Sequence, residues 1–290
     1  MGRKRLLVCD GHNIVYRSFF AIKNLSRADG FPINAIFGFI RQIDALKVRL
    51  GPTHIAIVFD AGIPERRMKL LESYKAQRPH MPEDLRSQIE PIEEYLKHAR
   101  IPVLTVAGEE ADDVMGTIAH LAERDMDDGV MLVSSDKDLL QLVTERTLIC
   151  PPSGNADLIG RQEVLDKTGV NPEQIVDWLA MVGDSADNIP GVRGVGPKTA
   201  SKLLKQYGSL DSLYMSLEEL KPAGLREKME AGRGIVERNR ELMRLDTDLD
   251  LDLDLDRLAV CDPDPDALLG FFEEYELKAM AKRLREPELF

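Results

Sequence analysis

Four short apolar segments, each followed by acidic residues, constrain the fold of this chain most strongly. The segments are 5–9, 54–59, 101–106 and 130–133, and stretches with helical periodicity lie between them. Apolar strands that alternate with helices are typical of a mostly parallel sheet with helices on both faces. In such sheets ligands bind outside the carboxyl ends of the strands. The sequence therefore predicts an α/β fold with an acidic site along one sheet edge.

The candidate residues for that site are nine carboxylates that come directly after the apolar segments or in one later acidic loop. They are Asp10, Asp60, Glu110, Asp112, Asp113, Asp136, Asp138, Asp184 and Asp187. Crowded carboxylates raise one another's pKa unless a cation or a helix N-terminus offsets them. Hard oxygen ligands suit magnesium or manganese. For the run 107–114 alone, an equally good interpretation is that its acids face solvent and complement the dipole of the helix that they open.

A basic stretch separates the second and third apolar segments. Two expected helices, 63–74 and 82–98, flank a turn that carries Tyr74, Lys75 and Arg78. A basic run of this kind is usually a solvated helix face. Above an acidic edge, however, Lys75 and Arg78 could neutralise a phosphodiester. Tyr74 could stack on a base, although core packing is the commoner role. Few large apolar residues lie in 63–81, so we expect this segment to open easily as a gate.

The second half of the chain has a different character. A helix over 172–182 leads into the loop of Asp184 and Asp187, and a glycine-rich hairpin then opens a helix with several lysines. The candidate contacts there are Gly191, Val192, Gly194, Val195, Gly196, Lys198, Thr199 and Lys202. Glycines let backbone amides approach phosphates, and a helix N-terminus adds partial positive charge. The alternative is an ordinary glycine-rich turn.

These features predict two domains. Residues 1–170 are expected to form the α/β domain that carries the acidic edge, with the basic excursion at about 63–98, and residues 171–290 a helical domain with the phosphate-binding hairpin at about 189–206. Near the end, the Asp-Leu alternation of 246–256 predicts an edge strand or an extended strap whose leucines face inward. A final amphipathic helix is expected over 265–285.

Composition bears on partners and compartment. The net charge is −12, but setting aside the nine candidate ligands and the six aspartates of 246–256 leaves +3, so the remaining surface can bind phosphates. The three cysteines form no C-x-x-C pair, which favours a reducing cytosol over a disulfide framework or a zinc site. No stretch is apolar for long enough to cross a membrane.

Seven motifs in sequence order resemble the bacterial 5′-nucleases, the 5′→3′ exonuclease and flap endonuclease domains of DNA polymerase I and their free-standing relatives. They are Asp10-Gly11-His12, Val58-Phe59-Asp60, Tyr74-Lys75-Ala76, Glu110-Ala111-Asp112-Asp113, Ser135-Asp136-Lys137-Asp138, Gly183-Asp184 with Asp187-Asn188, and Gly191 to Ala200. The likeness runs through nearly the whole chain. No polymerase segment follows Phe290, so we expect a free-standing member or an excised domain.

The resemblance implies hydrolysis of DNA by two metal ions, Mg²⁺ or Mn²⁺. Asp10, Asp60, Glu110 and Asp112 would surround one ion, with Asp113 close by, and Asp136, Asp138, Asp184 and Asp187 the other. Two ions held roughly 3.5–4 Å apart can clamp the attacking and leaving oxygens of an in-line displacement. Lys75 and Arg78 match the family's basic arch residues, which steer the scissile phosphate. The glycine hairpin resembles a helix-two-turns-helix element, which grips duplex DNA and often holds K⁺ through backbone carbonyls, here those of Val192 and Val195.

The same resemblance implies the substrates and partners. They are DNA with a 5′ flap, nick or overhang, RNA–DNA primer junctions, and a functional link to DNA polymerase I in replication and repair. A monomer in the bacterial cytoplasm, associated with the nucleoid, is expected. Two alternatives remain from the residues themselves. A PIN-like ribonuclease would share the acidic edge but would not need the hairpin at 191–200, and a non-catalytic junction-binding protein would not need the full acid set.

Overall fold

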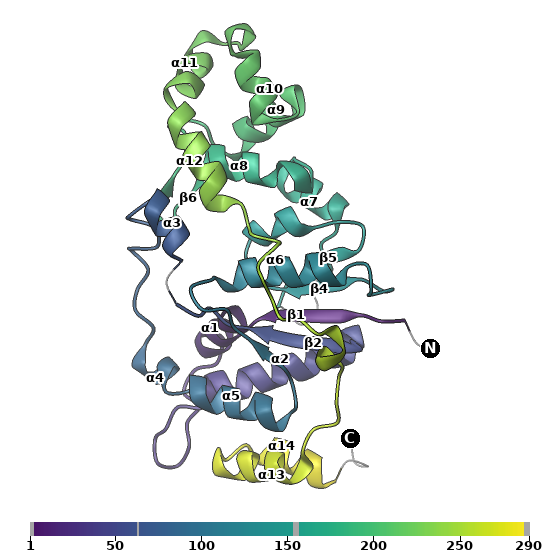
Figure 1. Cartoon of the computed structure of the whole chain (residues 1–290). Helices are drawn as coiled ribbons and strands as arrows, with labels where there is room; N and C mark the ends of the chain where they lie inside the picture. Colours follow the sequence, from purple (N-terminus) through teal and green to yellow (C-terminus); the bar gives the residue numbers. More distant parts are fainter. Residues whose placement is uncertain (1–2, 63, 153–156, 287–290) are drawn as a thin grey trace.

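The computed structural model describes residues 3–62, 64–152 and 157–286 (Figure 1). Its centre is a five-stranded sheet in the order β3-β2-β1-β4-β5, and every neighbouring pair in it is parallel. The strands are β1 Leu6–Asp10, β2 His54–Val58, β3 Val103–Leu104, β4 Val130–Val133 and β5 Thr147–Cys150. The predicted α/β fold with a mostly parallel sheet is therefore confirmed. The edge strand β5 was not predicted, and β3 is shorter than the apolar segment 101–106.

Both faces of the sheet are covered, because successive side chains of a strand point to opposite sides. Leu6 and Val8 of β1 belong to one core, with α6 (Ala111–Ala122) and the 3-10 helix η1 (Asp138–Leu142). Leu7 and Cys9 belong to the other, with α1 (Gly11–Ala21), α2 (Asn34–Leu50) and α5 (Ile89–His98). The uninterrupted apolar pattern of β1 follows from this double burial.

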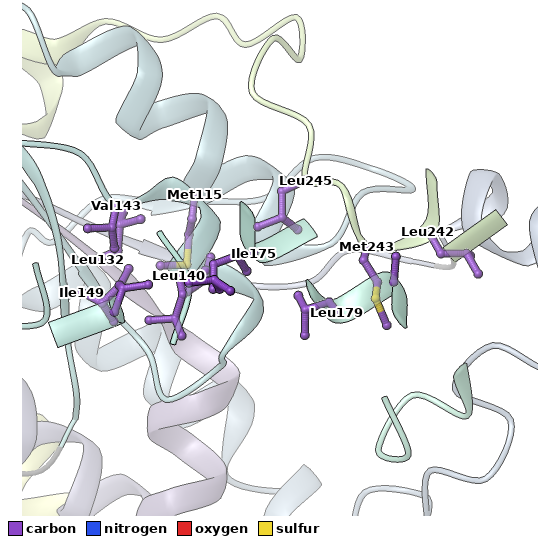
Figure 2. Close-up of a cluster of buried hydrophobic side chains, with 14 of the residues drawn as sticks. Met115, Leu132, Leu140, Val143, Ile149, Ile175, Leu179, Leu242, Met243 and Leu245 are labelled. Atoms are coloured by element: carbon purple, nitrogen blue, oxygen red, sulfur yellow. The ribbon is translucent and has the colours of Figure 1, made fainter. Parts of the chain in front are cut away.

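The first core continues into the second half of the chain. Figure 2 shows buried side chains of β4, β5 and η1 followed by those of α8 and α12. The elements of this half are α7 Arg161–Thr168, η2 Pro172–Gln174, α8 Ile175–Val182, β6 Gly183–Asp184, β7 Ile189–Pro190, α9 Pro197–Tyr207, α10 Leu210–Met215, η3 Leu217–Glu219, α11 Ala223–Ala231 and α12 Arg233–Met243. The helices therefore stand on the α6 side of the sheet and share its core.

The Asp-Leu alternation forms an extended strap, as predicted. Its leucines, Leu249, Leu251, Leu253 and Leu255, pack on the first core, while the aspartates from Asp248 to Asp256 are exposed. The strap runs from α12 across α6 (Figure 1), where the amide of Leu249 donates to Thr117 Oγ1 over 3.3 Å. It ends in the short helix η4 (Leu255–Leu258), beside β2.

Two predicted helices are each divided in the structure. The stretch 82–98 is α4 (Glu83–Arg86) and α5, because the buried side chain of Gln88 turns to accept the amides of Ala35 and Ile36 at the start of α2. The stretch 265–285 is α13 (Pro265–Glu274) and α14 (Lys278–Arg285), because Glu276 adopts a φ of 53° and the amide of Leu277 turns back to Phe272 O.

These last two helices lie beneath α5, on the sheet side opposite α8 and α12 (Figure 1). Phe271 and Phe272 join the second core there. None of the helices that the structure describes is long and apolar enough to span a membrane.

Candidate active site

The acids predicted at the strand ends do gather along the carboxyl edge of the sheet. Asp10 ends β1 and caps α1, accepting the amide of Asn13 over 2.9 Å and the hydroxyl of Ser134 over 3.0 Å. Burial raises the pKa of Asp10 to about 6, and Asp60 adds repulsion, although the two hydrogen bonds oppose the rise.

Asp60 follows β2 and has more stabilising partners. It accepts the amide of Ala111 over 2.8 Å, at the N-terminus of α6, and lies 3.1 Å from His12 Nδ1. Partial burial raises the pKa of Asp60, but the hydrogen bonds from His12 and Ala111 outweigh it and hold the pKa at about 2. Asp60 therefore stays ionised at neutral pH.

Asp112 and Asp138 are acids that interact electrostatically with the other acids of this edge. Burial raises the pKa of Asp112 well above its usual value, and repulsion from Asp136, Asp10 and Asp138 adds to it. Burial and the neighbouring Asp136 raise the pKa of Asp138 to about 8. The acids that repel one another in this way come from β1, α6 and the loop after β4, and together with Asp184 and Asp187 they are called the acidic array below.

The most compact part of the array is a triad that can hold a cation. Oxygen atoms of Asp138, Asp184 and Asp187 lie within 4.8 Å of one another. One oxygen of Asp138 is buried and has no hydrogen-bond partner among the described residues. A buried polar atom of this kind is costly unless something binds it. Carboxylate oxygens are the donors that Mg²⁺ and Mn²⁺ prefer, so the residues present fit a divalent metal ion.

Glu110 and Asp113 are held by the protein's own cations. The buried guanidinium of Arg67 donates to Glu110 Oε2 over 2.5 Å and to Asp113 Oδ1 over 2.9 Å. Asp113 is fully buried, and its only charged partner among the described residues is Arg67. The structure thus pairs Glu110 with both Arg67 and Lys75, whereas Asp113 pairs with Arg67.

The predicted arch residues lie directly on these acids. Lys75 Nζ contacts Glu110 Oε1 and lies 3.9 Å from Asp187 Oδ2, while Arg78 Nε donates to Asp187 Oδ1 over 3.1 Å. Tyr74 is buried and its hydroxyl donates to Glu110 over 3.1 Å, which agrees with core packing and leaves its ring unavailable for stacking on a base.

The expectation that the segment 63–81 opens easily stays a prediction, but its described residues up to Arg78 have polar contacts that hold them in place. After the short helix α3 (Glu65–Leu70), the turn 73–78 is tied to the acidic loop 184–188. The amide of Lys75 donates to Asp187 O over 3.0 Å, and Asn188 Nδ2 donates to Ser73 O over 2.8 Å. The hydrophobic content of the segment does not reveal this anchoring, because hydrogen bonds to backbone atoms supply it. Residue 63 lies outside the described residues.

The glycine hairpin is built for close backbone approach. Gly183 in β6 and Gly191 after β7 cross so tightly that a Cβ on Gly183 would lie 2.3 Å from Gly191 N. The hairpin leads through Val192, Gly194, Val195 and Gly196 into α9, whose Lys198 and Lys202 are exposed and whose Thr199 is half-buried. Val192 and Val195 are buried, so the turn exposes its backbone and the side chain of Arg193 beside the lysines of α9.

Sequence reasoning missed several residues that support the acids. Ser134 holds Asp10, His12 holds Asp60, and Lys137 Nζ lies 2.7 Å from Asp184. Arg67 lies in the basic stretch between the second and third apolar segments, and nothing in the sequence separates it from its basic neighbours. His12 and Lys137 do lie inside the quoted motifs, next to an acid, and that adjacency was the available signal.

Carboxylates crowded at the carboxyl edge of a parallel sheet, with a lysine and an arginine placed over them, define a metal-dependent nuclease. Comparison with known proteins identifies the kind. Residues 5–169 match the family model of the 5′-3′ exonuclease N-terminal resolvase-like domain, and residues 170–266 match that of the 5′-3′ exonuclease C-terminal SAM fold. The chain belongs to the 5′-3′ exonuclease family, which confirms the resemblance carried by the seven motifs.

Individual relatives support this assignment to the family. The chain is 43% identical over 283 residues to a 5′-3′ exonuclease of Aquifex aeolicus, covering 97% of this chain and 95% of that protein. It is 40% identical over 276 residues to the thermostable DNA polymerase I of Thermus thermophilus, covering 95% of this chain but 32% of the polymerase.

Two kinds of solved structure share the fold. T5 5′-exonuclease with bound zinc has a TM-score of 0.68 and 23% identity, over 94% of this chain and 98% of that one. The catalytic core of Rad2 in complex with DNA substrate has a TM-score of 0.63 and 20% identity, over 94% and 88%.

Proposed function

We propose that this nuclease hydrolyses DNA phosphodiesters at 5′ ends and 5′ flaps with two divalent metal ions, Mg²⁺ or Mn²⁺. The observation that carries the proposal is the acidic array, in which Asp138 has a buried oxygen without a partner among the described residues, and the neighbouring Asp187 is in contact with Lys75 and Arg78. So many buried carboxylates are electrostatically costly without bound cations. A solved T5 flap endonuclease complex with DNA and metal ions has the same fold, which supports the choice of ligand.

The residues that would hold the ions follow from the array. Asp10, Asp60, Glu110 and Asp112 lie on the β1, β2 and α6 side, and Asp136, Asp138, Asp184 and Asp187 lie on the side of the acidic loop. When bound, the metal ions supply an activated water and a charge that stabilises the leaving oxygen. Asp113 is a support in this proposal, because Arg67 occupies its carboxylate.

The chain's own cations would hold the scissile phosphate. Lys75 and Arg78 now neutralise Glu110 and Asp187, and a phosphodiester placed over the acids can replace these carboxylates as their partner. Positive charges placed where phosphate charge develops stabilise the transition state more than the ground state. Tyr74 would keep Glu110 oriented by its hydroxyl.

The hairpin at 189–206 would grip duplex DNA through its backbone, with K⁺ on the carbonyls of Val192 and Val195. Lys198→Ala together with Lys202→Ala should weaken binding to all duplex sequences and lower the slope of log affinity against log salt by about two, one unit per phosphate contact. Titration of flap DNA at several salt concentrations measures this slope. An unchanged slope, or a loss confined to some sequences, would contradict backbone gripping.

The remaining expectations belong to the same proposal. We infer a division near residue 170 between catalytic and duplex-binding parts, with α13 and α14 added to the catalytic part. The polymerase relatives support a functional link to DNA polymerase I at primer junctions. A monomer working on cytoplasmic, nucleoid-associated DNA fits this role.

One assay tests the activity. Labelled 5′-flap DNA, single-stranded RNA and blunt duplex DNA are each incubated with the protein and Mg²⁺. We expect cleavage at the flap junction, with short products from duplex 5′ ends and little from RNA. Preferred cleavage of RNA would favour a PIN-like ribonuclease, and flap binding without cleavage of any substrate would favour a junction-binding protein.

A further inference from the structure

Lys137 is a further cation of the chain that lies within the acidic array. It stands between Asp136 and Asp138, directly before η1, and its Nζ is 2.7 Å from Asp184 Oδ2. Among the described residues this is the only ion pair of Lys137. The Asp184 side chain is 11% exposed, whereas the Lys137 side chain is 40% exposed. The pair therefore joins a buried acid to a lysine that solvent reaches.

Both oxygens of Asp184 are engaged by the protein itself. Asp184 Oδ1 accepts the amide of Ala186 over 2.8 Å, and Oδ2 contacts Lys137. Asp184 also contributes an oxygen to the triad with Asp138 and Asp187 that fits a divalent ion. An ion bound to this triad would lie beside the Lys137 ammonium, and like charges at close range repel strongly where little water screens them. The lysine and the ion therefore compete for Asp184.

The side chain of Lys137 is able to leave its acid, unlike that of Arg67. The Arg67 guanidinium is buried and is held by two acids and a backbone carbonyl at the end of α12. Lys137 has a single charged contact, at the end of a partly exposed stem. A lysine ammonium is a compact charge on a flexible four-carbon stem, so it can change partners without any backbone movement. Lys137 is thus suited to exchange and Arg67 to support.

We propose that Lys137 is an exchangeable counter-ion of the acidic array. In the metal-free protein it neutralises Asp184, and when a divalent ion binds the triad it gives up Asp184 and donates to a phosphate of the DNA strand instead. Such charge-assisted hydrogen bonds are among the strong ones. The inference rests on the proposed function and adds a phosphate contact to it. Lys75 and Arg78 reach the acids from the arch, whereas Lys137 reaches them from the loop after β4.

A labelling experiment on the wild-type protein follows this exchange directly. An amine-reactive reagent is applied in a chelator, in calcium, and in calcium with 5′-flap DNA, and modification of each lysine is quantified by mass spectrometry. We expect Lys137 to react severalfold faster in calcium than in the chelator, because Asp184 no longer holds its ammonium, and to be protected again by DNA. Lys97, exposed on α5, is the control and should react equally in all three states. An unchanged rate at Lys137 overturns the exchange.

Lys137→Met separates a competitor of the metal from a mere support of Asp184. Removing a competitor should tighten Mn²⁺ binding to the DNA-free protein roughly tenfold by calorimetry, as expected for a lost hydrogen bond to a charged group. It should also lower the slope of log affinity for flap DNA against log salt, measured in calcium, by about one. Lys97→Met should change neither quantity.

Weaker Mn²⁺ binding by Lys137→Met would show that the lysine only supports Asp184, and an unchanged salt slope would refute the phosphate contact. Either result overturns the proposal. Cleavage of flap DNA by the wild-type protein in Mg²⁺ is measured in parallel, so a failure of the nuclease proposal is seen separately.

Discussion

Asp138→Asn should abolish cleavage and at the same time stabilise the metal-free protein. The substitution removes a candidate metal ligand, and the lost stabilisation of transition-state charge is several kcal/mol, which corresponds to roughly a thousandfold or more in rate. It also removes a buried charge that is repelled by Asp136, Asp184 and Asp187 and that leaves one oxygen without a partner. Activity and stability therefore change in opposite directions.

The pH dependence follows from the same residue. The pKa of Asp138 is raised to about 8 and that of Asp10 to about 6, so between about pH 4 and 8 the folded protein binds more protons than the unfolded chain. Stability falls with rising pH wherever the folded state binds more protons. The metal-free protein should thus be most stable near pH 4–5 and lose stability toward pH 8, and Asp138→Asn should flatten the upper part of this decline.

Thermal unfolding in a chelator at pH 5 and 8 measures both effects, with each kcal/mol worth roughly 2–4 °C. Asp252→Asn, on the exposed side of the strap, is the matched control and should change neither activity nor melting temperature appreciably. Retained cleavage at saturating Mg²⁺, or a melting temperature below wild type at pH 8, would show that Asp138 is not a strained metal ligand.

The sequence predicted the acidic edge correctly because strand ends and acids coincide. Asp10 and Asp60 each follow an apolar run, and parallel strands bring such ends together regardless of how the helices pack. What the acids touch could not be predicted in this way. Arg67 stands among Arg66 and Lys69, and the same helical pattern would arise if all three faced water. Only the packing of α3 on α12 makes Arg67 the buried member of the three.

The helix boundaries were predicted in the wrong places because they too depend on tertiary contacts. Propensity alone favours continuing through Gln88, and the helix breaks there because the side chain has partners 52 and 53 residues away, at the start of α2. β5 has an apolar run of only three residues after Thr147, which is too short to predict a strand, and pairing with β4 stabilises the strand. Tertiary contacts decided each of these cases.

Arg67→Gln should be the most destabilising single substitution in the arch. Arg67 is 3% exposed, and its guanidinium bridges Glu110, Asp113 and the carbonyl of Leu242 at the end of α12. Removing it leaves the fully buried Asp113 without a charged partner among the described residues. Breaking a buried ion pair from one side costs about 3–5 kcal/mol, because the remaining charge stays desolvated.

The neighbouring Arg66→Gln is a strict control for this effect. Arg66 is half exposed and pairs with Asp246 at 3.3 Å, so its loss should cost no more than about 1 kcal/mol. Urea unfolding in a chelator compares the two variants. Because Arg67 joins α3 to α12 and to Glu110, its loss should also weaken Mg²⁺ binding measured by calorimetry. Arg67→Lys should restore the positive charge, but a lysine lacks the forked guanidinium that reaches both acids. If Arg67→Gln is as stable as Arg66→Gln, the ion pair with Arg67 is not what stabilises the buried Asp113.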